Sequence, residues 1–241
     1  IIAGKACKTQ VTVNRIMTVV NINMKRNSAK AWVLASRPKT LTGAAVPVML
    51  GGAYAWYQVQ DVSLIEWGAL VLCFLFAFIM QIDANFINDY YDCKKGRDNE
   101  ERLGPPRACQ QGWVTMPAMR IAICVTTALA CLVGLPLAWY GGWEMIAVGA
   151  ACVVFCFLYT VCLAQLGLGD VLVVVFFGIV PCCCTYYVVV PPEYQSLQMM
   201  PWLLGLANGL MTDTLLIVNN YRDIDNDRNA GKKTLVVLIG K

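Results

Sequence analysis

The stretch Asn85-Phe-Ile-Asn-Asp-Tyr-Tyr-Asp92-Cys-Lys-Lys-Gly-Arg-Asp98 begins where a long apolar segment gives way to charged residues. At about 100° per residue, one helix face roughly 100° wide carries Gln81, Asn85, Asn88, Asp89 and Asp92. Carboxylate and amide oxygens gathered in this way suit a hard cation. Mg2+ in particular is usually held by one or two carboxylates, with water and substrate phosphates completing its shell. The stretch therefore predicts a metal site at a helix end.

The composition predicts an all-α, polytopic membrane protein. The chain has 241 residues, of which 58% are hydrophobic and 14% charged, and its mean hydropathy is +0.57. It has 12 Cys and no His. Cys182-Cys183-Cys184 stand in an apolar run and no Cys-x-x-Cys pair occurs, which favours cysteine as apolar filler over a metal or redox role. Without His, catalysis must use Asp, Lys, Arg or Tyr.

Six apolar segments are long enough to cross a bilayer, which takes about 20 residues per helix. We place them at roughly 40–57, 64–88, 119–138, 143–163, 168–190 and 201–221.

All 19 Lys and Arg residues fall on one side of these segments, and the connections 58–63, 140–143 and 191–200 contain none. The positive-inside rule then places both termini and the charged loops in the cytoplasm, with the chain in the inner (cytoplasmic) membrane. A soluble bundle would have no reason to sort its cations so. We expect the lipid bilayer as a partner and no nucleic acid, and the oligomeric state is open.

A second polar stretch, Asn219-Asn-Tyr-Arg-Asp223-Ile-Asp-Asn-Asp227, echoes the first at the end of the last segment. By the same arithmetic, Asp213, Asn220, Asp223 and Asp227 lie on one helical stripe. Two matched clusters suggest two related halves whose acidic faces meet across a central cavity. Facing carboxylates repel each other unless a cation lies between them, so the pair again implies metal. The plainer alternative for each cluster is a helix end with solvated charges.

A lipid diphosphate would use both a metal and a cationic loop beside a membrane cavity. Mg2+ neutralises the phosphates, Arg and Lys bind the remaining oxygens, and apolar helices hold the hydrocarbon tail. The basic candidates are Arg37, Lys39, Arg97, Arg102, Arg107, Arg222, Arg228, Lys232 and Lys233. For each of them the alternative is a topology signal or a lipid headgroup contact.

Three motifs together resemble the UbiA-type intramembrane prenyltransferases: Asn88-Asp89-x-x-Asp92 with Gly96-x-Asp98, then Arg102-Leu-Gly-Pro-Pro-Arg107, and Asp223-x-x-x-Asp227. Gly167-Leu-Gly-Asp170 and Asn219-Asn-Tyr-Arg-Asp223 resemble more narrowly the 1,4-dihydroxy-2-naphthoate polyprenyltransferase branch of menaquinone synthesis. The wider superfamily usually has its third acid where this chain has Gly96. That departure argues against the 4-hydroxybenzoate and haem-farnesylating branches.

The resemblance implies a mechanism and a site. Asp89 or Asp92 with Asp98, and Asp223 with Asp227, would hold Mg2+ on the diphosphate of an all-trans polyprenyl diphosphate. Asn85, Asn88 and Asn220 would orient ligands. Ionisation would give an allylic cation, the ring of 1,4-dihydroxy-2-naphthoate would attack it, and loss of CO2 would give demethylmenaquinone.

The resemblance also implies a nine-helix bundle, so we expect Met24–Lys241 to be a transmembrane prenyltransferase domain that is incomplete at its C-terminus. Residues 1–23 look foreign to the rest and are expected to be an upstream extension.

Other functions stay open at this point. Another UbiA-type aromatic prenyltransferase is one. A secondary transporter is a second, with Asp83, Asp170 and Asp213 as ion sites. A structural membrane subunit is a third, although it has no use for two matched acidic clusters. Asp83 lies about 160° round the helix from Asn85, so it is expected to pair with another helix.

Overall fold

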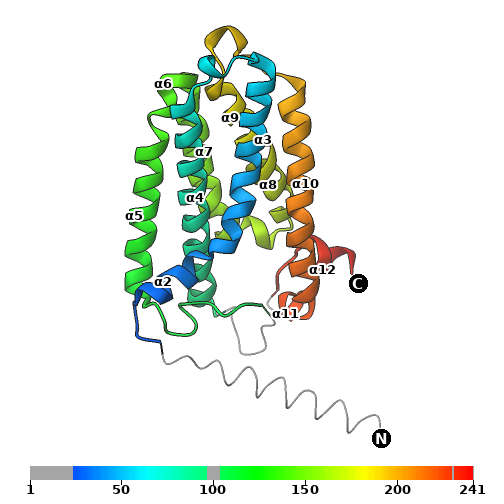
Figure 1. Ribbon diagram of the computed structural model, residues 1–241. Helices are drawn as coiled ribbons and strands as arrows, with labels where there is room; N and C mark the ends of the chain where they lie inside the picture. The colour runs from blue at the N-terminus through cyan, green and yellow to red at the C-terminus, as the bar shows by residue number, and fades with distance from the viewer. Residues whose placement is uncertain (1–23, 97–103, 230, 241) are drawn as a thin grey trace, which may run out of the picture.

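Helices supply all the regular secondary structure in the described part of the chain. The computed structural model describes residues 24–96, 104–229 and 231–240. Six long helical segments run side by side (Figure 1). They are α3 (Leu41–Val59), α4 (Trp67–Lys94), α5 (Met116–Gly134) with α6 (Leu137–Gly141), α7 (Glu144–Val161), α8 (Gly169–Val174) continued by η4 (Val175–Ile179) and α9 (Val180–Val189), and α10 (Met199–Arg222). Their order matches the six predicted segments, except that α4 continues to Lys94 and so contains the whole Asp89–Asp92 motif.

Five of these segments are long and apolar enough to cross a membrane. The sixth, α3, has 19 residues, but glycines, Pro47 and polar residues near its ends dilute its hydropathy. Large apolar side chains on the outside of the bundle, such as Ile121 and Leu132 on α5 or Leu203 and Leu215 on α10, stay exposed. An outer surface of this kind suits lipid. The prediction of an all-α, multi-pass membrane bundle is confirmed.

Short helices gather at one end of the bundle. α2 (Ala29–Ser36), α11 (Ile224–Asn229) and α12 (Leu235–Ile239) lie at its lower end in Figure 1. The described Lys and Arg residues belong to the segments that meet there. The opposite end carries the short turns η2 (Val62–Leu64) and η5 (Pro192–Tyr194), which contain no cation. The Lys and Arg residues that the sequence predicted on one side of the membrane thus lie at one end of the bundle.

A polar corner joins α2 to α3 and is held by α4. Arg37 ends α2 in the left-handed backbone region with φ 50°, and the turn η1 (Pro38–Thr40) follows. The Thr40 hydroxyl accepts hydrogen bonds from Gln81 Nε2 and Asn85 Nδ2, each at 3.0 Å. Asn85 Nδ2 also donates to the Ser36 carbonyl at 2.9 Å. Two amides of the predicted polar face therefore fix the entry to the first long helix.

The π-helical segment η4 divides the α8–α9 span at the level of the cavity described below. A π turn widens the helix and leaves a carbonyl without its usual partner. Asn208 of α10 supplies a partner, since its Nδ2 donates to the Phe177 carbonyl at 2.7 Å. On the same side Gly178 meets Gly205 and Gly209 of α10 backbone to backbone. The bulge thus joins α10 closely to the bundle.

Candidate active site

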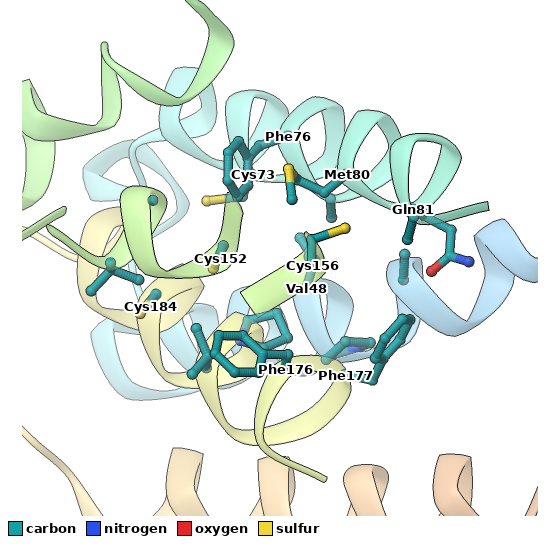
Figure 2. A pocket seen from close by; sticks show the side chains of 18 of the residues that line it. Val48, Cys73, Phe76, Met80, Gln81, Cys152, Cys156, Phe176, Phe177 and Cys184 are labelled. Carbon is teal, nitrogen blue, oxygen red and sulfur yellow. The ribbon is translucent and has the colours of Figure 1, made fainter. Parts of the chain in front are cut away.

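A cavity of about 280 Å3 lies among α3, α4, α7 and the α8–α9 span. Its wall is mostly apolar, and Figure 2 shows Val48, Phe76, Met80, Phe176 and Phe177 around it. The cysteines Cys73, Cys152, Cys156 and Cys184 also line it. All the described cysteines are free, and these four serve as small apolar wall residues.

One end of the cavity is polar. Gln81, Asn85, Asn88 and Tyr159 line it there, and Figure 2 shows Gln81 at the opposite end from Cys184. The Asn88 Oδ1 accepts a hydrogen bond from the buried Thr160 hydroxyl of α7, which fixes the side chain of Asn88. This end faces the acidic motif at the end of α4, whereas the rest of the cavity wall is mostly apolar.

Acids from both halves of the chain approach Tyr159. Its phenol lies near Asp92, Asp170 and Asp213 and near Arg107. Asp170 and Asp213 are both 7% exposed, and each has one carboxylate oxygen without a hydrogen-bond partner. The halves therefore do meet at the cavity end, but Asp170 and Asp213 are the acids of the second half that lie near Tyr159. The sequence placed Asp213 on the stripe of the second motif and Asp170 in the Gly167-Leu-Gly-Asp170 motif, but it assigned neither of them to the prenyltransferase site.

The two acids of the first motif have different surroundings. Asp89 is 1% exposed, and its two oxygens accept hydrogen bonds from the backbone amides of Ala108 at 2.9 Å and Cys109 at 3.1 Å. Burial and then the Asp89 charge raise the pKa of the Cys109 thiol well above its ordinary value. Asp92 instead pairs with Arg107 at 2.8 Å. Asp89 thus holds the loop after the motif, while Asp92 forms an ion pair with the Arg107 side chain.

The single stripe that we predicted for the second motif assumes one continuous helix, and this assumption is wrong because the helix is interrupted at Asp223. α10 ends at Arg222, Asp223 caps it with φ −97° and ψ 10°, and α11 follows. Asn and Asp side chains compete for backbone hydrogen bonds and so favour helix ends, which explains the break in a run this rich in them. Arg222 binds Asp223 through two nitrogens, at 3.1 and 2.8 Å, and Lys232 Nζ binds Asp227 at 2.8 Å.

The remaining predicted residues are spread over the same end of the bundle. Arg37 and Lys39 lie at the α2–α3 corner, Asn220 is half-buried near the end of α10, and Arg228 reaches Asp225 at 3.7 Å. The backbone amide of Lys233 donates to the Gln165 carbonyl at 3.0 Å, while its side chain is exposed. Arg97, Asp98 and Arg102 lie outside the described residues. The roles of all these residues stay predictions.

Asp83 has the partner on another helix that its position on α4 predicted. It is fully buried, and its oxygens accept hydrogen bonds from the hydroxyls of Thr126 and, at 2.8 Å, Thr127 on α5. Two helices are joined by this carboxylate. The transporter hypothesis uses Asp83 as one of three ion sites, but both of its carboxylate oxygens already accept hydrogen bonds from these threonines.

The acids fit a hard divalent cation in chemistry, because carboxylate oxygen is the ligand type that Mg2+ prefers. In the described ranges, however, no three Cys, Asp or Glu side chains are grouped closely enough to hold a metal ion. Asp92, Asp223 and Asp227 are each paired with Arg or Lys. The type of donor atom therefore supports the metal prediction. How the acids would be arranged around the metal is a proposal.

Comparison with known proteins agrees with this arrangement. Residues 44–241 match the model of the UbiA prenyltransferase family. The chain belongs to this family. It is 35% identical over 223 residues to the 1,4-dihydroxy-2-naphthoate octaprenyltransferase of Escherichia coli K12, covering 88% of this chain and 69% of that protein.

Two further relatives show the breadth of the family. The Mycobacterium tuberculosis protein of the same name is 35% identical over 216 residues, covering 87% of this chain and 70% of that one. The UbiA prenyltransferase domain-containing protein 1 of Danio rerio is 29% identical over 228 residues, covering 89% and 63%. The resemblance drawn from the Asp motifs is confirmed, and the chain is a prenyltransferase enzyme.

Sequence reasoning missed one residue that the UbiA fold places at the cavity end, Tyr159. A signal was available. Met145, Gly149, Cys152, Cys156 and Tyr159 recur at helical spacing along α7 and all line the cavity. A tyrosine that ends an otherwise small and apolar face would have pointed to the polar end. The pattern was hidden because α7 is apolar on every side.

Proposed function

We propose that the protein transfers a polyprenyl group from an all-trans polyprenyl diphosphate to 1,4-dihydroxy-2-naphthoate, with loss of CO2 to give demethylmenaquinone. The observation that carries the proposal is an apolar cavity whose one polar end adjoins paired acids and cations. A lipid diphosphate has the same division into an apolar tail and an anionic head. The relatives named as 1,4-dihydroxy-2-naphthoate octaprenyltransferases suggest the acceptor.

The cavity's own residues would bind and orient the reactants. Val48, Phe76 and Phe177 would contact the prenyl tail, and the ordered amides Asn85 and Asn88 would orient groups at the polar end. An allylic cation is quenched readily by water, so a mostly apolar wall would protect it. The aromatic faces of Phe76, Phe176 and Phe177 also favour a nearby positive charge.

The charged end would receive the diphosphate. Arg107, Arg222 and Lys232 already lie at acids of the two motifs, and their positive charges would stabilise the leaving diphosphate. Asp92, Asp223 and Asp227, with Asp98, would hold Mg2+. When bound there, Mg2+ neutralises diphosphate charge and makes it a better leaving group. Asp89 would keep its place as an anchor of the loop that carries Arg107.

We also propose that the charged end of the bundle faces the cytoplasm in the inner membrane, since the described cations gather there. Met24–Lys241 would form the transmembrane prenyltransferase domain, and residues 1–23 would lie upstream of it. The family match begins at residue 44, within α3, and includes every long segment after it.

The test uses the full chain in membranes with labelled polyprenyl diphosphate and carboxyl-labelled 1,4-dihydroxy-2-naphthoate. We expect a labelled lipid product and release of one labelled CO2 per product. The control acceptor is 4-hydroxybenzoate, which we expect to give little product. Preference for 4-hydroxybenzoate would assign the chain to another aromatic branch. Product that retains the carboxyl label would contradict the proposed reaction.

A further inference from the structure

The apolar arm of the cavity runs along one face of α7, away from its polar end. Tyr159 lies at the polar end and Gly149 lies ten residues earlier on the same helix, about 15 Å away at the rise of an α-helix. Met145 follows one turn beyond Gly149 and also lines the cavity. A tail that starts near Tyr159 and follows this arm therefore passes Gly149 before it meets Met145.

Gly149 leaves space that a side chain would fill. A Cβ built on it would meet no other atom within 4 Å, although the residue lines the cavity. Gly134, the other glycine of the wall, differs, because a Cβ there would lie 3.0 Å from the Phe76 ring, so its lack of a side chain serves helix packing. The missing side chain at position 149 serves the cavity and not the contact between helices.

The neighbours of Gly149 fix the direction in which a side chain would point. Met145 and Cys152, one turn to either side of it on α7, line the same cavity. A side chain between them would enter the arm. Since α7 is helical and Gly149 has no positive φ, an L-residue fits its backbone. A larger residue should thus narrow the arm without unfolding the protein.

We propose that Gly149 is a specificity-determining residue, which leaves the passage that a long prenyl tail needs beyond its first isoprene units. The inference rests on the proposed function. A larger side chain at 149 would collide with the units that reach it and would leave unaffected a donor whose tail ends before it. The residue thereby discriminates among donors by tail length and leaves the reacting end unchanged.

The experiment compares wild type, Gly149→Ala and Gly149→Leu with all-trans donors of increasing length, from geranyl to octaprenyl diphosphate, and 1,4-dihydroxy-2-naphthoate. We expect Gly149→Leu to lower kcat/KM for the longest donor by at least about tenfold, while the shortest donor that wild type accepts changes less than about twofold. Gly149→Ala should fall between them.

The matched control is Gly43→Leu on α3. A Cβ at Gly43 also meets nothing within 4 Å, but this residue does not line the cavity. It should leave the donor preference unchanged. The folded fraction of each variant is measured by size exclusion in detergent, so that loss of protein is not counted as loss of activity.

The outcomes separate the two ideas. Wild type that makes no product with any donor overturns the proposed function. If wild type is active and Gly149→Leu lowers kcat/KM for all donors equally, or for none, the role of Gly149 is overturned and the proposed reaction stands. Only a loss of kcat/KM that grows with the length of the prenyl tail supports the proposal that Gly149 leaves a passage for it.

Discussion

Arg107 Nη2 lies 2.8 Å from Asp92 Oδ2, and the two side chains are only 8% and 13% exposed. Pro105 and Pro106, whose rings restrict the backbone, directly precede Arg107. Asp89 holds the next residues of the loop through the backbone amides of Ala108 and Cys109. An arginine held in this way keeps its place beside the acidic motif. A cation that served only as a topology signal would need no such support.

Arg107→Lys should therefore impair catalysis although it keeps the charge. Lysine lacks the planar fork that can bind a carboxylate and a phosphate together. We expect turnover to fall by at least about tenfold, which is about 1.4 kcal/mol of transition-state stabilisation. Arg120→Lys, on an exposed side chain in the first turns of α5, is the control and should have almost no effect. Equal behaviour of the two variants would remove Arg107 from the site.

Asp83→Ala should destabilise the fold and leave the chemistry of the folded protein intact. The substitution removes the acceptor that joins α4 to Thr126 and Thr127 of α5. Loss of a buried partner costs about 1–3 kcal/mol. Unfolding in detergent should show the loss, and Asp83→Ala combined with Thr127→Val should cost less than the sum of the two changes. Strict additivity would show that the two side chains do not interact.

The helical spans were predictable because membrane insertion requires long apolar runs, whatever the details of packing. The same holds for the side of the bundle that carries the cations. Asp83 was expected to pair with another helix from its angle relative to Asn85 alone, and α5 provides that partner. These features depend on helix geometry and composition, which a single sequence contains.

The division of labour between Asp89 and Asp92 was not predictable, because it depends on where the loop after the motif folds back. Their angular positions are close, yet one meets backbone amides and the other a guanidinium. The break at Asp223 was missed for a related reason, since 100° arithmetic assumes a continuous helix. Tyr159 became visible only when α4 and α7 were placed around one cavity.

Gly178→Ala should loosen α10 from the bundle. A Cβ at Gly178 would overlap the Gly205 carbonyl oxygen and lie 2.6 Å from the Gly209 Cα, so backbone would have to move. Such close approach between small residues joins membrane helices tightly. We expect a loss of about 1–3 kcal/mol in the free energy of unfolding. The matched change Gly43→Ala, with open space around it, should be neutral or slightly stabilising.

The orientation in the membrane can be measured with single cysteines in a cysteine-free background. Ser63 and Ser196 are exposed at the end without cations, and Asn229 is exposed at the other end. In intact cells, an impermeant maleimide should label cysteine placed at the first two positions and spare the third. Labelling at Asn229 from outside would invert the orientation and place the diphosphate end on the wrong side.

Asp89→Asn and Asp92→Asn should separate anchoring from metal binding. Asp89 accepts one backbone amide on each oxygen, and an amide side chain can accept only one of them, so this variant should lower the folded fraction. It should leave the Mg2+ concentration for half-maximal turnover unchanged. Asp92→Asn should instead raise that concentration at least about tenfold, because a neutral oxygen is a weaker ligand for Mg2+. Activity of the wild type should vanish in EDTA and return with added Mg2+. Full turnover in EDTA, or the same Mg2+ response in both variants, would show that Asp92 does not bind the metal.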